Sequence, residues 1–357
     1  MKILITGACA VSARSVLRSL KMSEIFKDST FIGWDMCTLL YGVYAGDFDR
    51  IYKVPAVSDP AYRDVVQKIL DEEHPDAVIV VPEVEVLYWS KNPFSTPHLV
   101  PPPNFSELVI SKERLFDALS GTELVPRYEN ISSQSIMQPD FDNPLGYPVW
   151  IRDGAAGTAS AMGAYKAGSL NELQAWVKIN HQTTHFQLSQ FLPGRNLGCF
   201  CLFKEGKLIK MAQAQRINYM MAKVAVSGIT GNTSEGKLLN EDKIKTVALS
   251  AIKLLCDKTG EKMNGLVVVD MKEDVFGNPI ITEINIRHVA FSSSFAMAGH
   301  NIAEAQLLLT LGMDNIISKP VQKDYPKGNL MLRDVDGLPI YVENTVNLNI
   351  GDYYQKN

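Results

Sequence analysis

Residues 265–272 read GLVVVDMK, residues 279–286 read PIITEINI, and the turn Phe276-Gly277-Asn278 lies between them. Both runs are short, apolar and rich in β-branched residues, so the stretch predicts an antiparallel hairpin. Side chains alternate between the two faces of a strand, which places Glu283 and Asn285 on the same face. If the strands pair across the turn, Asp270 of the first strand lies close to both.

This hairpin carries a candidate metal site. Two carboxylates and an amide oxygen on one face form a set of hard oxygen ligands, and Mg²⁺ is typically bound by one or two carboxylates together with substrate phosphates. Carboxylates embedded in apolar strands are costly unless they are paired or bound to a metal. We therefore predict that Asp270, Glu283 and Asn285 bind Mg²⁺. A solvated polar face of the hairpin is the alternative.

Two residues follow the hairpin directly. Arg287 comes two residues after Asn285 and continues on the same face if the strand persists. A guanidinium there can hold a carboxylate or a transferring phosphoryl group, and a salt bridge to Glu283 is the alternative. His288 should face the other way, and we predict a structural role for it.

Outward from the hairpin towards the N-terminus, the first hundred residues alternate strands and helices. The strands are predicted at 2–6, 31–35, 51–54 and 77–81, and the helices at 12–20 and 62–73. This alternation predicts a doubly wound α/β sheet with right-handed crossovers. The three consecutive prolines at 101–103 mark a candidate domain boundary.

The remainder of the chain mixes helices with hairpins, as in an α+β fold. Helices are predicted at 111–119, 170–179, 242–258 and 302–311, single strands at 147–152 and 186–192, and further hairpins at 197–203 with 207–214 and at 330–333 with 339–342. Residues 349–357 are polar and are expected to be frayed.

A loop of small residues follows the strand at 147–152. Residues 153–163 read DGAAGTASAMG, with three glycines and four alanines. Small residues let backbone N–H groups approach phosphate oxygens. The loop lacks the Gly-Lys-Ser/Thr ending of a Walker loop, and a flexible connector is an equally good interpretation. Arg152 before the loop and Lys112 at the start of an earlier helix are candidate phosphate-binding cations.

Other kinds of site are less well supported. The first turn has Gly7 alone, so the Gly-x-Gly-x-x-Gly pattern of nicotinamide enzymes is missing, although Asp35 stands where an acid would bind a ribose. His181 and His185 lack a third ligand, so a metal pair is not expected. Cys199 and Cys201 share one strand face and are interpreted as a core pair.

Composition sets the broad class. The 357 residues predict two or three domains, and 46% hydrophobic with 21% charged residues is typical of a globular protein. A charge of −4, from 35 basic and 39 acidic residues, argues against a broad nucleic-acid surface. No apolar run approaches the roughly 18–20 residues that span a bilayer, and the start does not resemble a signal peptide. We expect a cytoplasmic protein whose five cysteines are reduced.

The order of these elements resembles the ATP-grasp superfamily, especially the branch related to the carbamoyl-phosphate synthase large subunit. The most specific piece is Thr282-Glu283-Ile284-Asn285-Ile286-Arg287, with Asp270 thirteen residues before Glu283. The resemblance covers residues 1–315. It implies a Rossmann-like pre-ATP-grasp domain at 1–105 and a two-lobed ATP-grasp domain at 106–317. The predicted C-terminal hairpin and tail follow at 318–357. The small lid lobe would span about 125–190 and the large lobe about 191–317.

The resemblance also implies roles for individual residues. Asp270, Glu283 and Asn285 would hold Mg²⁺, with Mn²⁺ as an alternative, on the phosphates of ATP. Arg287 would face the reacting substrate, and Arg216 would be a further cation there. The implied nucleotide-binding residues are Lys112, Arg152, Gly154, Gly157, Thr158 and Ser160, and at the hinge Gln190, Phe191 and Leu192. Arg152 stands where the family usually has lysine, and Gln190 where it often has glutamate.

The implied reaction is an ATP-dependent ligation. A small carboxylate is activated as an acyl phosphate, an amine attacks it, and ADP and phosphate are released. The two departures from the family pattern keep a second hypothesis open, a nucleotide-binding protein with weak or no ligase activity in an accessory role. The expected partners are small carboxylate and amine substrates, with a homodimer as the expected assembly and no nucleic acid or membrane. Residues 218–223 would line the substrate pocket or form a surface or dimer contact.

Overall fold

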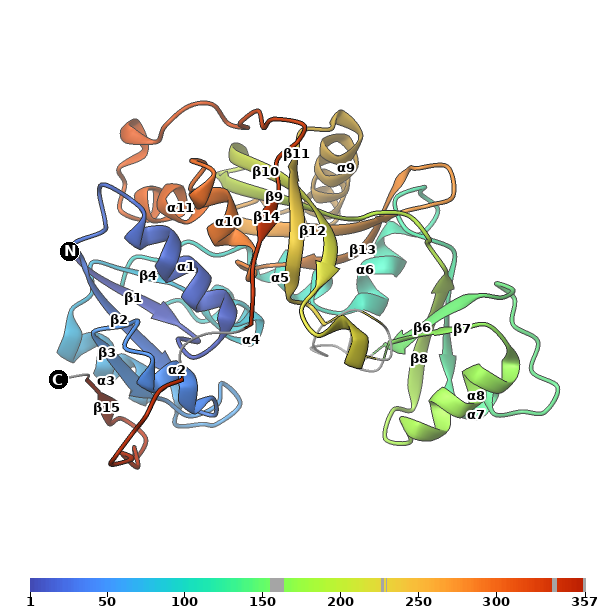
Figure 1. Cartoon of the computed structure of the whole chain (residues 1–357), viewed down its shortest axis with the longest axis horizontal. Coiled ribbons are helices and arrows are strands. Elements are labelled where there is room, and N and C mark those ends of the chain that lie inside the picture. Colours follow the sequence, from blue (N-terminus) through green and yellow to red (C-terminus); the bar gives the residue numbers. More distant parts are fainter. Residues whose placement is uncertain (155–163, 226–227, 229, 336–338, 356–357) are drawn as a thin grey trace.

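The computed structural model describes residues 1–154, 164–225, 228, 230–335 and 339–355. Its strands form three sheets, one at the N-terminal end, a large one in the middle and a small one on the opposite side of the molecule (Figure 1). Gly157, Thr158 and Ser160 of the small-residue loop lie outside the described residues.

The N-terminal sheet has four parallel strands in the order β3-β2-β1-β4, as the alternation of strands and helices predicts. Ile3 and Ile5 of β1 pack into one core cluster, whereas Leu4 packs into another, so both faces of this sheet are buried. The strands are β1 (Lys2–Thr6), β2 (Thr30–Asp35), β3 (Arg50–Lys53) and β4 (Ala77–Ile79), and the helices are α1 (Val11–Lys21), α2 (Leu40–Tyr44), α3 (Tyr62–Glu73) and α4 (Glu83–Lys91).

Asp35 at the end of β2 is engaged by the chain itself. Its carboxylate accepts hydrogen bonds from the backbone N–H groups of Cys9 at 3.0 Å and Cys37 at 3.1 Å. These bonds tie the loop after β1 to the loop after β2. Asp35 therefore has a structural role in the position where a nicotinamide enzyme would bind a ribose.

The large sheet is antiparallel, in the order β13-β12-β9-β10-β11-β14. The predicted hairpins at 197–203 with 207–214 and at 265–272 with 279–286 are both confirmed. The strands are β9 (Asn196–Lys204), β10 (Lys207–Tyr219), β11 (Thr233–Leu239), β12 (Gly265–Glu273), β13 (Pro279–Asn285) and β14 (Met331–Leu332). The helices are α9 (Asp242–Thr259), α10 (Ser292–Met297) and α11 (Ile302–Thr310), with single 3-10 turns η1 (Ala222–Val224) and η2 (Asp314–Ile316).

Both faces of the large sheet are covered, because successive residues of β9 enter different cores. Cys199 and Cys201 pack in the cluster that contains Ile244 and other residues of α9, and their sulfur atoms lie 3.7 Å apart, as predicted for a core pair. Phe200 packs in the other cluster, with Phe295 of α10. No helix in the described part of the chain is both long and apolar enough to cross a membrane.

The small sheet has the order β5-β8-β6-β7 and packs on α7 and α8 through its own core. Its elements are β5 (Tyr128–Ser132), α7 (Ser133–Ile136), β6 (Val149–Asp153), β7 (Tyr165–Ala167), α8 (Leu170–Ile179) and β8 (His185–Gln190). Ser169 caps α8 by accepting from the N–H of Glu172 at 3.3 Å. Helices α5 (Pro103–Val109) and α6 (Lys112–Leu119) precede this sheet in the chain.

Two predictions for the C-terminal segment are wrong. The hairpin of 330–333 with 339–342 does not form, because residues 339–342 are not a strand and β14 pairs with β11 of the large sheet. Residues 349–355, the described part of the predicted frayed end, are ordered by contacts with the N-terminal sheet. Tyr353–Tyr354 form β15, which pairs with β3 and extends the N-terminal sheet. Ring contacts of Tyr353 with Tyr52 and of Tyr354 with Tyr44, at 5.0 and 5.1 Å between centroids, hold this end in place.

Candidate active site

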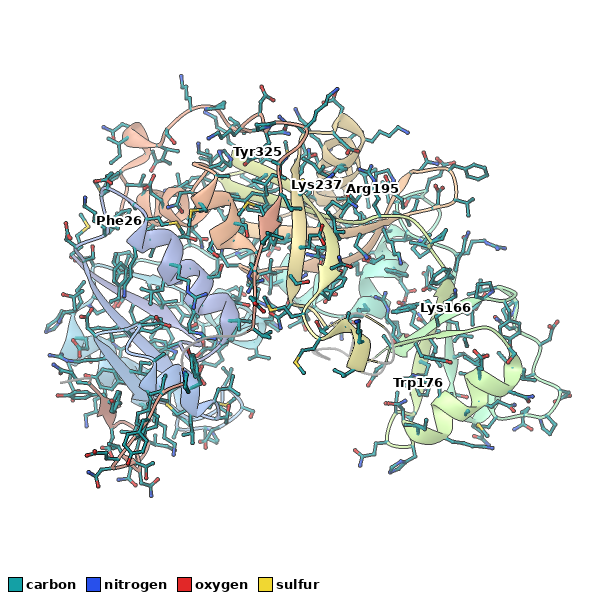
Figure 2. The ribbon with its side chains drawn as sticks, in the orientation of Figure 1. Phe26, Lys166, Trp176, Arg195, Lys237 and Tyr325 are labelled. Atoms are coloured by element: carbon teal, nitrogen blue, oxygen red, sulfur yellow. The ribbon has the colours of Figure 1, made fainter. Side chains whose placement is uncertain are left out.

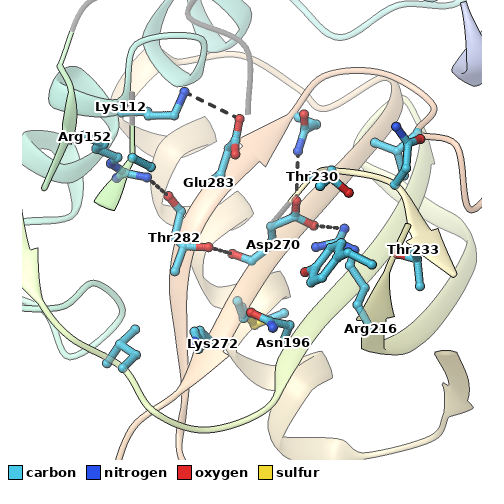
Figure 3. A pocket seen from close by; sticks show the side chains of 18 of the residues that line it. Lys112, Arg152, Asn196, Arg216, Thr230, Thr233, Asp270, Lys272, Thr282 and Glu283 are labelled. Atoms are coloured by element: carbon cyan, nitrogen blue, oxygen red, sulfur yellow. Dashed lines mark hydrogen bonds and ion pairs between the residues drawn. The ribbon is translucent and has the colours of Figure 1, made fainter. Parts of the chain in front are cut away.

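The β12–β13 hairpin brings the predicted metal ligands together. Asp270 lies directly opposite Glu283 in the strand register, and Asn285 lies opposite Val268. The amide nitrogen of Asn285 donates to Oδ2 of Asp270 at 3.2 Å. The three side chains therefore share one face of the hairpin, on which Figure 3 labels Asp270 and Glu283.

Cations from other elements face both carboxylates. Arg216 of β10 donates through Nη2 to Oδ1 of Asp270 at 2.5 Å. Lys112, the first residue of α6, places Nζ 3.7 Å from Oε1 of Glu283. The side chains of both pairs are less than one-fifth exposed. Two negative and two positive groups are thus held in a partly buried site (Figure 3).

Burial and charge act against each other in the Arg216–Asp270 pair. Burial raises the pKa of Asp270, the Arg216 guanidinium opposes that rise, and Glu283 adds to it. Burial acts to lower the pKa of Arg216, but the charge of Asp270 outweighs burial and the pKa is raised overall. Arg216 therefore stays charged, and the 2.5 Å contact favours an ionised Asp270 at neutral pH.

Arg152 of β6 occupies a slot that suits a planar guanidinium. It donates to Oε1 of Gln187 from Nε at 3.0 Å and from Nη2 at 2.6 Å, and to the carbonyl of Thr282 from Nη1 at 2.9 Å. Its guanidinium carbon lies 4.9 Å from the ring centroid of Phe116. Burial lowers the pKa of Arg152 to about 10, so the side chain remains charged at neutral pH. The sequence analysis missed Gln187, a fully buried polar residue of β8.

The segment between the small and large sheets is fixed by charge. Arg195, whose place is labelled in Figure 2, lies in this segment. It donates from Nη1 and Nη2 to Glu241, both at 2.8 Å, and from Nε to Glu273 at 2.9 Å. The N–H of Gly194 donates to the carbonyl of Glu273 at 3.0 Å. This anchor holds the predicted hinge residues, Gln190 to Leu192, against the start of the large sheet.

The hinge also has cations that the sequence analysis missed. Lys166 of β7 and Lys272 of β12 place their ammonium groups 4.2 and 5.2 Å from the ring centroid of Phe191. Burial lowers the pKa of Lys272, and Lys166 lowers it further. Lysine at a strand end has no distinctive local pattern, so only the tertiary structure shows this cluster.

Arg287 does not continue the strand, because β13 ends at Asn285. Its Nη1 donates to the carbonyl of His288 at 3.0 Å, and its Nε lies 4.0 Å from Oε1 of Glu83 on α4. The carboxylate beside Arg287 is therefore that of Glu83, in place of the alternative salt bridge to Glu283. The buried ring of His288 lies between Ser292 Oγ at 2.9 Å and Gln306 Oε1 at 2.7 Å, a structural position as predicted.

Most of the predicted site residues line one cavity of 340 Å³. The predicted residues that line it are Lys112, Arg152, Gln190, Phe191, Leu192, Arg216, Asp270, Glu283, Asn285 and Arg287. Gly154 is described but is not among the lining residues, and its N–H donates to the carbonyl of His185 at 3.3 Å. The described lining residues include six basic and three acidic side chains, so the cavity suits an anionic ligand.

The hairpin donors fit a metal that shares its ligands with a phosphate. Within the described ranges, no group of three His, Cys, Asp or Glu side chains forms a complete protein cage for a metal. Asp270, Glu283 and Asn285 offer two carboxylates and one amide oxygen, and the remaining Mg²⁺ positions would be filled by ligand oxygens and water.

Comparisons with known proteins show which known fold the chain resembles. No family model and no curated protein matches the sequence. Solved structures do match. An L-amino acid ligase from Bacillus licheniformis has a TM-score of 0.60 at 16% identity, covering 87% of this chain and 74% of that one. An ATP-grasp superfamily protein from Archaeoglobus fulgidus has a TM-score of 0.53 at 16% identity, covering 86% and 88%.

A third structure contains ligands. The biotin carboxylase domain of the Hydrogenobacter thermophilus 2-oxoglutarate carboxylase, in complex with MgADP and bicarbonate, has a TM-score of 0.58 at 13% identity and covers 87% of this chain and 69% of that one. The chain has the ATP-grasp fold. The prediction of an ATP-grasp fold, made from the hairpin and the order of elements, is therefore confirmed. At these identities the likeness establishes the fold, and the roles of the individual ATP-grasp residues remain predictions.

Proposed function

We propose that the chain is an ATP- and Mg²⁺-dependent ligase that activates a small carboxylate as an acyl phosphate and joins it to an amine. The observation that carries the proposal is the convergence of Asp270, Glu283 and Asn285 with Lys112, Arg152 and Arg287 around one cavity. The similar biotin carboxylase structure holds MgADP and bicarbonate, a nucleotide and an oxyanion of the expected kinds.

The hinge end of the cavity suits the nucleotide base. Gln190 to Leu192 line this end, and the ring of Phe191 lies beside Lys166 and Lys272. From there the cavity extends to Lys112 and Arg152, which offset the charge of the phosphates. We also propose the division into a pre-ATP-grasp domain at 1–105, an ATP-grasp domain at 106–317 and a tail, as the resemblance implies.

The protein groups act mainly by position and charge. A metal bound to Asp270, Glu283 and Asn285 would supply positive charge to the phosphate oxygens. Arg287 and Arg216 line the same cavity and orient the carboxylate that attacks the γ-phosphorus. The carboxylate oxygen forms the new P–O bond as the bond to ADP breaks. The amine then attacks the acyl carbon and phosphate leaves.

The substitution Glu283→Gln tests the proposal. It keeps the size of the side chain but removes a charge from the metal site, so we expect phosphate release from MgATP to fall by at least 100-fold. The assay supplies pooled amino acids and small carboxylic acids. Glu24→Gln, at a side chain that is 86% exposed, is the matched control and should retain wild-type activity. Full activity in Glu283→Gln would refute the assignment.

The accessory hypothesis gives a different result. Arg152 replaces the usual lysine, and its donors face Gln187 and Thr282 within the protein. A nucleotide-binding protein without ligase activity would show a thermal shift with MgATP or ADP and no phosphate release with any pool. A shift with NAD(H) alone would contradict both hypotheses.

A further inference from the structure

The C-terminal segment adds a cation to the cavity. Arg333 directly follows β14, is half-buried and lines the same cavity as Arg216 and Arg287. Its backbone N–H donates to the carbonyl of Ser234 at 2.8 Å, and its Nη1 donates to the carbonyl of Thr233 at 3.3 Å. Pairing of β14 with β11 therefore fixes where this guanidinium lies.

Arg333 lies away from the nucleotide end. Lys112 and Arg152 lie on one side of the metal carboxylates, and Thr233, whose carbonyl binds Arg333, lies on the other (Figure 3). In the large sheet, β14 and β13 are the two opposite edges. The neighbouring wall includes Val11 and Ser12 of α1 and residues 289–291 before α10. Arg333 thus faces space that the proposed nucleotide position leaves to the second substrate.

Within the part of the chain that the structure describes, no acidic side chain balances the charge of Arg333. Lys112, Arg216 and Arg287 each have a carboxylate within 4.0 Å. Among the described residues, no carboxylate lies that close to a nitrogen of Arg333, and its neighbour in charge is another cation, Arg18. Burial and Arg18 both lower the pKa of Arg333. An anionic ligand would relieve this unfavourable environment.

We propose that Arg333 binds a substrate carboxylate other than the one that is activated. The activated carboxylate loses its charge as it becomes an acyl phosphate, so a cation away from the phosphates is suited to a carboxylate that stays ionised. A guanidinium can hold such a group through two parallel hydrogen bonds. The second carboxylate belongs either to an amino acid that supplies the amine or to a dicarboxylic acid that supplies the acyl group. This inference rests on the proposed function.

The experiment measures binding, which needs no turnover. The protein is saturated with Mg²⁺ and the non-hydrolysable analogue AMPPNP, and ligands are titrated by calorimetry up to 10 mM. One arm compares L-amino acids with their carboxamides, and the other compares malonate, succinate, glutarate and adipate with their half-amides. We expect one acid to bind at least tenfold more tightly than its amide, and the arm in which it occurs identifies the source of the carboxylate.

Substitutions then assign the preference to Arg333. Arg333→Gln should reduce the acid-to-amide ratio to within twofold, and Arg333→Lys should retain part of it. AMPPNP affinity should stay within twofold in both variants. Arg18→Gln removes an exposed arginine near Arg333 and should leave the ratio unchanged. A melting temperature close to that of the wild type shows that each variant is folded.

Three results would overturn the proposal. These are an unchanged ratio in Arg333→Gln, an equal loss of AMPPNP affinity, and the absence of acid binding by the wild type in both arms. An Arg333-dependent preference without phosphate release would support this inference and contradict the ligase proposal. Phosphate release by the wild type, together with an unchanged acid-to-amide ratio in Arg333→Gln, would support the ligase proposal and contradict this inference.

Discussion

At the scale of single residues, Arg152 has contacts that suit a guanidinium at a position where the resemblance to the ATP-grasp family predicts lysine. Lysine would offer one nitrogen, whereas the guanidinium of Arg152 reaches Gln187 and the carbonyl of Thr282 at the same time. The bond to Thr282 joins β6 of the small sheet to β13 of the large sheet, whereas Gln187 lies on β8 of the small sheet. Arg152 therefore places a charge in the cavity and also holds the two sheets together.

His288 gives a prediction of pH-dependent stability. Burial lowers its pKa to about 4, whereas a histidine in the unfolded chain titrates near 6.5. Between these values the unfolded state binds more protons, so the stabilisation is complete above pH 6.5 and is lost as pH falls towards 4. The difference corresponds to about 3 kcal/mol. We expect wild-type stability in urea to fall by about this amount relative to His288→Gln when pH is lowered from 7 to 4.

The comparison between variants is needed because buried acids act in the opposite direction. Burial raises the pKa values of Asp35 and Glu85, so their contributions are lost as pH rises. His181→Gln, at an exposed histidine, is the matched control and should keep the wild-type pH dependence. The same loss of stability in His288→Gln as in the wild type would contradict the prediction.

Residues of the site differ in how far they could be predicted. Asp270, Glu283 and Asn285 were predictable because one turn and the alternation of strand side chains decide their arrangement. Gln187, Lys272 and Arg333 were not, because their positions depend on pairing between distant segments. Arg333 reaches the cavity through a bond to Thr233, 100 residues away in the chain. No local pattern specifies that contact.

At the scale of elements, the hinge depends on a close approach that favours glycine. A Cβ atom at Gly194 would lie 2.5 Å from Cβ and 2.8 Å from the carbonyl oxygen of Glu273. Gly194→Ala must therefore displace the hinge from β12, which moves Phe191 relative to Lys272. We expect a loss of stability of about 1–3 kcal/mol and at least fivefold weaker binding of Mg²⁺ and AMPPNP, measured by thermal unfolding and calorimetry.

Gly328 provides the control for this substitution. A Cβ there would meet no atom within 4 Å, so Gly328→Ala should change neither stability nor nucleotide affinity appreciably. Wild-type affinity in Gly194→Ala would show that the hinge tolerates the displacement and that Phe191 does not contact the nucleotide.

The strands that were missed share a physical cause. The strands β5, β7 and β11 have few consecutive apolar residues, and β5 and β11 carry polar side chains such as Glu129 and Glu235. Their stability comes from ladders with β8, β6 and β10 rather than from their own composition. The N-terminal strands were predictable because both of their faces are buried and the apolar runs are unbroken.

At the scale of the whole molecule, the C-terminal segment connects two sheets. It contributes β14 to the large sheet and β15 to the N-terminal sheet (Figure 1). Helix α11 also connects the N-terminal sheet with the large sheet. Leu307 packs in the core of the N-terminal sheet, and Leu309 packs in the core of the large sheet. Ser15 of α1 also binds Ser293 of α10. The Ser15 hydroxyl accepts from the N–H of Ser293 at 2.8 Å and donates to the Ser293 hydroxyl at 3.0 Å.

The last prediction concerns the docking of this segment on the N-terminal sheet. Leu348 is 7% exposed, Tyr354 packs on Tyr44, and the N–H of Lys53 donates to the carbonyl of Asp352 at 2.9 Å. The double variant Leu348→Ser/Tyr354→Ser removes apolar contacts worth about 2–4 kcal/mol. We expect a melting temperature lower by roughly 4–10 °C and faster amide hydrogen exchange at residues 50–53, where β3 loses its neighbour.

The matched control is Ile350→Ser/Tyr341→Ser, which makes a similar change at side chains that are 52% and 86% exposed. It should melt within about 1 °C of the wild type, because surface substitutions have small effects. Amide hydrogen exchange in β12 and β13 should remain slow in both variants. In the large sheet, β13 is the edge strand opposite β14, and β12 is the strand next to β13. If Leu348→Ser/Tyr354→Ser and its control have the same melting temperature, the C-terminal segment is held by β14 alone. Its contact with the N-terminal sheet then adds no stability.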